Sequence, residues 1–69
     1  MADSREISAL RDRIGELGRL HRAKALAWHE ALRLRQRGAC AELAEAMRYL
    51  DCERAKCCAR LRQLQKGVR

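Results

Sequence analysis

Four cysteines and two histidines are the residues of this chain best suited to bind a metal ion or to act as nucleophiles. Cys40, Cys52, Cys57 and Cys58 follow the spacing C-x11-C-x4-C-C, which lacks the C-x-x-C pair that recurs in structural zinc sites. On a helix, adjacent Cys57 and Cys58 would point about 100° apart, so they cannot easily bind one ion together. The spacing favours cysteines that are buried as small apolar side chains, with a metal site or a regulatory disulfide as alternatives. We expect no metal ion and no cofactor.

The sequence also lacks the common catalytic motifs. It contains no glycine-rich phosphate loop, no H-E-x-x-H and no G-x-S-x-G pattern. Both histidines, His21 and His29, fall within helical patterns, and a lone histidine in such a pattern is more often structural than catalytic. We therefore expect a protein that is not an enzyme.

The chain is strongly basic, with 16 Lys or Arg against 9 Asp or Glu among 69 residues, a formal net charge of +7. Such a charge on a small chain is typical of proteins that bind nucleic acid. No acidic residue follows Glu53. The candidate phosphate-binding residues there are Arg54, Lys56, Arg60, Arg62 and Lys66. Because the basic residues are spread around the helices rather than gathered on one stripe, direct binding of RNA or DNA is the alternative function.

The elements that position these residues are two long helices. Apolar residues recur at steps of three and four from Ile7 to Leu32, which is the period of one helical face. Gly38 predicts the end of this first helix, because glycine readily adopts the left-handed conformation of a helix C-cap. A second periodic run extends from Ala39 to Leu64.

Only a few residues around Gly38 remain for a turn, and so short a connection makes the two helices antiparallel neighbours. The predicted fold is all-α, an antiparallel helical hairpin in one domain. The domain spans 1–69 and consists of a helix at about 4–37, a turn near Gly38 and a helix at about 40–66. In this pairing His21 and Lys24 would face Glu53 and Arg54.

Two glycines, Gly15 and Gly18, interrupt the first helical pattern, and each costs about 1 kcal/mol relative to alanine. They indicate a kink or a place where another backbone approaches closely. A three-helix arrangement that breaks between them is the structural alternative.

The apolar sector of the first helix is wider than one neighbouring helix requires, because Leu20, Ala27 and Leu34 extend it along one flank. The surplus predicts that two hairpins associate into a four-helix bundle, a homodimer. The second helix carries a separate face of small residues, which either contacts another helix or is solvated: Ala41, Ala44, Cys52, Ala55 and Ala59. Cys52 is then an interface residue or an exposed thiol.

A candidate protein-binding face lies on the first helix, where Arg22, Leu26, His29 and Arg33 recur at steps of four, three and four. They share a face away from the apolar sector. An exposed leucine among arginines has the composition of an interface hot spot. Tyr49, off the main stripe of the second helix, is a further candidate anchor. We predict that these five residues bind a partner protein.

No apolar run approaches the roughly 18–20 residues that a transmembrane helix needs. The first six residues lead into no apolar stretch of the kind found in signal peptides. We therefore expect a cytoplasmic protein that does not bind membranes.

In its length and its Arg-, Ala-, Leu- and Cys-rich composition, the whole chain from Met1 to Arg69 resembles the anti-quorum-sensing anti-activators of Mu-like phages of pseudomonads. The resemblance implies a phage-encoded dimeric hairpin that acts in the host cytoplasm. It implies binding to the DNA-binding domain of a LuxR-type quorum-sensing transcription regulator, and a type IV pilus assembly ATPase as a second target. No motif is shared, so no functional residue is transferred from that family.

Overall fold

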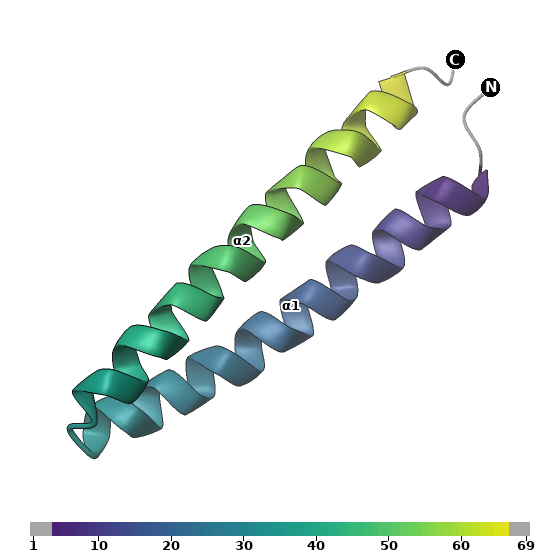
Figure 1. Ribbon diagram of the computed structural model, residues 1–69. Helices are drawn as coiled ribbons and strands as arrows, with labels where there is room; N and C mark the ends of the chain where they lie inside the picture. Colours follow the sequence, from purple (N-terminus) through teal and green to yellow (C-terminus); the bar gives the residue numbers. More distant parts are fainter. Residues whose placement is uncertain (1–3, 67–69) are drawn as a thin grey trace.

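The structure of the chain, a computed structural model, describes residues 4–66 and contains two helices (Figure 1). Helix α1 spans Ser4–Arg33 and helix α2 spans Arg37–Lys66. The helices run side by side in opposite directions, so that Ser4 and Lys66 lie at the end farthest from the turn. This arrangement confirms the predicted all-helical hairpin.

The turn lies at Leu34–Gln36, one helical turn before the position predicted at Gly38. Arg35 adopts the left-handed conformation, with φ 58°, whereas no glycine of the described residues has a positive φ. The backbone N–H of Gln36 donates to the Ala31 carbonyl at 2.9 Å, and that of Arg35 to the Leu32 carbonyl at 3.1 Å. These two hydrogen bonds form a Schellman motif, which satisfies carbonyls at the end of α1.

The predicted boundaries are therefore wrong at this end of the hairpin. α1 stops at Arg33 rather than near residue 37, and α2 begins at Arg37 rather than near residue 40. Gly38 is a helical residue in the first turn of α2. The left-handed residue costs about 1 kcal/mol when it is not glycine, and the hydrogen bonds of the motif offset part of this cost.

The earlier turn changes which residues face each other. His21 contacts Asp51, with 3.4 Å between His21 Nε2 and Asp51 Oδ1, rather than Glu53 and Arg54 as the sequence predicted. Farther from the turn, Arg60 Nε donates to Glu6 Oε1 at 3.0 Å. Polar contacts thus join the two helices at the middle and at the open end of the hairpin.

The α1 helix continues without a break through Gly15 and Gly18, which excludes the three-helix arrangement. The hairpin is a thin rod of 52 × 14 × 12 Å, and its radius of gyration of 15.7 Å exceeds the roughly 11 Å of a compact chain of this length. Among the described residues, only Leu17 and Ala31 are buried, with 1% and 4% of their surface exposed. Most of the seam is therefore half-buried.

Substitutions at Gly38 and Arg35 test the position of the turn. We expect Gly38→Ala to raise the free energy of unfolding by about 0.5–1 kcal/mol, because Gly38 is helical and a Cβ there meets no atom within 4 Å. Arg35→Gly should stabilise by about 1 kcal/mol because it removes the strain of the left-handed residue. Urea unfolding followed by circular dichroism measures both. A destabilised Gly38→Ala variant would mean that the chain turns at Gly38.

Candidate functional site

Two depressions flank the middle of the seam between the helices, one on each side. A third, about 420 Å³, lies at the turn and is lined by Leu32, Arg35, Arg37 and Cys40. At 100° per residue, Leu20 and Lys24 lie to one side of the seam residue His21, whereas Gly18 and Arg22 lie to the other. The first depression, about 440 Å³, is called the Tyr49 groove here and is lined by Leu20, Lys24, Glu42, Glu45, Ala46, Tyr49 and Leu50. The second, about 330 Å³, is called the arginine groove and is lined by Ile14, Gly15, Gly18, Arg19, Arg22 and Arg54.

The arginine groove concentrates positive charge. Among residues 4–66, no carboxylate lies within ion-pair distance of Arg19, Arg22 or Arg54. A guanidinium presents a fork of donors that matches the two oxygens of a carboxylate or a phosphate. This groove can therefore bind an anionic group of a partner.

The glycines of this groove do not bring the two helices into close contact. A Cβ on Gly18 would meet nothing within 4 Å, and one on Gly15 would meet only the flexible end of Arg19, at 3.5 Å. The hairpin itself does not need either glycine. Their effect is to leave the wall of the arginine groove without side chains.

Four of the five predicted partner-binding residues share one exposed face of α1. This face, called the α1 ridge here, consists of Arg22, Leu26, His29 and Arg33. Leu26 is 67% exposed. The His29 ring packs edge-on against Trp28, with 5.2 Å between ring centroids. Arg33 forms two hydrogen bonds of 2.9 Å with the carboxylate of Glu30, so its charge is neutralised within α1.

Tyr49 does not belong to the α1 ridge. It is 62% exposed and lies in the Tyr49 groove, whereas Arg22 lines the opposite groove. One flat partner surface cannot contact both residues at once. The structure therefore separates Tyr49 from the other four predicted residues.

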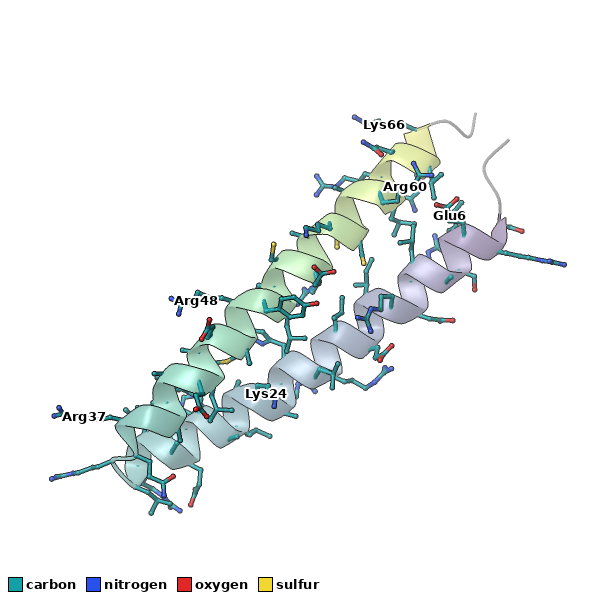
Figure 2. The ribbon with its side chains drawn as sticks, in the orientation of Figure 1. Glu6, Lys24, Arg37, Arg48, Arg60 and Lys66 are labelled. Atoms are coloured by element: carbon teal, nitrogen blue, oxygen red, sulfur yellow. The ribbon has the colours of Figure 1, made fainter. Side chains whose placement is uncertain are left out.

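The predicted nucleic-acid set is divided as well. Lys56 donates to Glu53 at 3.4 Å, a hydrogen bond that raises the pKa of Lys56, and Arg60 is paired with Glu6 (Figure 2). Both cations thus have carboxylate partners. Arg54 lies in the arginine groove, and Arg62 and Lys66 are exposed on α2.

Sequence reasoning missed Arg19, which the structure places beside Arg22 and Arg54. Its spacing of three residues from Arg22, on the side of the helix that carries Gly15 and Gly18, is the signal that indicates this position. Arg54 enters the groove only because α2 packs there.

The cysteines offer no metal site in the part of the chain that the structure describes, where no three His, Cys, Asp or Glu side chains come together. Cys40, Cys57 and Cys58 are half-buried rather than buried as predicted, because a seam between only two helices covers each of them from one side. Cys52 is an exposed free thiol.

No model of a known protein family matches this chain, and comparisons with curated proteins and with solved structures find no match either. Within residues 4–66, neither helix has an apolar stretch long enough to cross a membrane. The exposed side chains of the hairpin are therefore the features from which a function can be inferred.

Replacing Gly18 tests whether the fold or the groove needs this glycine. We expect Gly18→Ala to raise the melting temperature by about 4–8 °C, because alanine favours the helix by about 1 kcal/mol. Thermal unfolding followed by circular dichroism measures the change. A lower melting temperature would show that Gly18 makes a close contact that the hairpin alone does not reveal.

Proposed function

We propose that this protein is a non-enzymatic inhibitor that acts as a homodimer and binds a protein partner through the α1 ridge. The observation that carries the proposal is the 67% exposure of Leu26 on a face that also presents Arg22 and His29. Burying a leucine side chain contributes about 1.5–3 kcal/mol, and apolar anchors next to arginine are typical of interface hot spots.

The composition of the ridge indicates how a partner would be held. Arg22 has no carboxylate within ion-pair distance among the described residues, so it is available to an acidic group of the partner. The ring of His29, which packs edge-on against Trp28, belongs to the same face as Leu26. The ridge therefore fits a surface that combines an apolar pocket with a nearby carboxylate.

From the resemblance to phage anti-activators we propose a specific partner, the DNA-binding domain of a LuxR-type regulator. Because the ridge is cationic, it would bind an acidic or apolar patch of that domain rather than imitate the charge of DNA. DNA binding would then be blocked by the bulk of the hairpin. A type IV pilus assembly ATPase is a second proposed partner on the same grounds.

Leu26→Glu tests the ridge directly. We expect this variant to keep its helicity but to lose binding to the purified DNA-binding domain of a LuxR-type regulator by about 100-fold or more, because a charge replaces the apolar anchor. Titration calorimetry measures the affinity, and a gel-shift assay measures whether DNA binding by the domain is restored.

Two charge reversals, one on the ridge and one on the far side of α2, form a test and its matched control. Arg22→Glu should weaken binding, whereas Arg48→Glu, which changes the net charge equally on the side of α2 away from α1, should not (Figure 2). Equal losses of affinity for both variants would mean that binding depends on the net charge of the protein and not on Arg22. Undiminished binding by Leu26→Glu would exclude the ridge.

A second function, binding of RNA or DNA, is favoured by one specific observation, the unpaired cations of the arginine groove. Lys56 and Arg60 are paired with carboxylates, whereas Arg19, Arg22 and Arg54 line one groove together, so these three arginines are the proposed phosphate-binding residues. This set shares Arg54 with the one predicted from the sequence.

The salt dependence of binding separates the two functions. If phosphates bind in the arginine groove, replacing its three arginines by glutamine should lower the slope of log affinity against log salt by about 1 for each arginine that had bound a phosphate. The matching change of Lys56 and Arg60 to glutamine should leave the slope nearly unchanged. Fluorescence anisotropy with a short labelled duplex measures both slopes, and equal slopes for all proteins would exclude this function.

A further inference from the structure

The Tyr49 groove is an apolar face that the hairpin leaves without a cover. The chain exposes 5717 Å², whereas a compact protein of 7.9 kDa exposes about 4,400 Å². The excess of about 1,300 Å² is comparable to the roughly 800 Å² that each partner buries in a standard protein interface. Leu20 and Tyr49, 42% and 62% exposed, are the large apolar side chains that line this groove most openly.

Charged residues of both signs border this apolar centre. Lys24 stands on the α1 side, and Glu42 and Glu45 stand on the α2 side. Within the described residues none of these three forms an ion pair. A surface that carries both signs next to an apolar strip is suited to pair with an identical surface.

We propose that a second copy of this chain occupies the Tyr49 groove, with the two-fold axis parallel to the helices. This inference rests on the proposed homodimer and names its interface. This axis packs α1 of one protomer antiparallel against α2 of the other. Each residue keeps the same height along the axis in both protomers. Lys24 of each protomer then meets Glu42 and Glu45 of its partner, while Leu20 and Tyr49 of both copies fill the centre.

Two other faces, the arginine groove and the small-residue face of α2, are poor self-association surfaces. Self-pairing of the arginine groove would bring Arg19, Arg22 and Arg54 against their own copies, and like charges at an interface cost several kcal/mol. The small-residue face of α2, with Ala55 and Ala59, is bordered by the exposed cations Arg48 and Arg62. Of these faces within residues 4–66, only the Tyr49 groove combines large apolar side chains with charges of opposite sign.

The alternative two-fold axis, perpendicular to the helices, is disfavoured by the same charges. It would place α1 of each copy over α1 of the other, with Lys24 near its own counterpart. The carboxylates of Glu42 and Glu45 would then face each other on the α2 side. The parallel axis avoids both repulsions.

A reciprocal charge exchange tests the interface. Lys24→Glu alone and the double variant Glu42→Lys, Glu45→Lys should each raise the homodimer dissociation constant by about 30-fold or more, because the Lys24–Glu42 and Lys24–Glu45 contacts, each present twice in the dimer, become repulsive. Mixing the two variants should restore a dimer that contains one chain of each, since every Lys–Glu contact is then attractive again. Native mass spectrometry distinguishes the mixed dimer from both homodimers. All proteins carry Cys52→Ser, which prevents cross-linking through the exposed thiol.

Two further variants keep the test independent of folding. Tyr49→Ala should weaken the dimer by about tenfold or more without loss of helicity, because Tyr49 is already exposed in the hairpin. Arg48→Glu, on the side of α2 away from the groove, should leave the dissociation constant unchanged (Figure 2).

The possible results separate this inference from the proposed function. A wild-type dimer that Lys24→Glu does not weaken, or a mixture that forms no mixed dimer, overturns the interface and leaves binding through Leu26 standing. A wild-type protein that stays monomeric overturns both this interface and the homodimer. A mixed dimer that still binds no protein partner supports the interface and removes the proposed inhibitor function.

Discussion

Two helices that pack against each other share one line of contact, and each helix can bury only the stripe that faces its neighbour. In this hairpin the constraint leaves Leu17 as the one large side chain that is fully covered among the described residues. The other large apolar residues there lie half-buried in the seam or are exposed, and Leu26 is exposed on a face away from the seam. Exposed apolar surface is therefore a direct consequence of the architecture, and the question of function becomes the question of what covers each exposed face.

Polar contacts across the seam accompany one register of α2 on α1. His21 pairs with Asp51 and Glu6 with Arg60 in the register that α2 adopts on α1, and this register determines which charges share a groove. A shift by one helical turn would leave the apolar stripes in contact but would move every charged neighbour. The Glu6–Arg60 ion pair is largely exposed and so contributes little to stability. The register itself sets the pattern of charge along the two grooves.

Features that depend on one helix alone could be predicted from the sequence, whereas features that depend on how the two helices pack could not. The apolar period identified the two helices and the exposure of Leu26, because the phase of a residue on its own helix is enough for both. The turn could not be located, since the same stripe repeats every three to four residues and a left-handed Arg35 has no sequence signature. The positions that depend on the partner helix, such as the pairing of Arg60 and the separation of Tyr49 from the α1 ridge, were therefore not predictable either.

The two grooves differ in the occupants that their charges allow. The Tyr49 groove carries both signs and can accept a copy of itself, whereas the arginine groove repels its own copy and attracts an anion. If the first groove is covered by a two-fold partner, the two arginine grooves and the two α1 ridges lie on opposite outer faces of the dimer. One flat surface then cannot contact both ridges, so each protomer binds its own partner molecule. Dimerisation in this arrangement supplies the missing core without using the residues that are proposed to bind a partner.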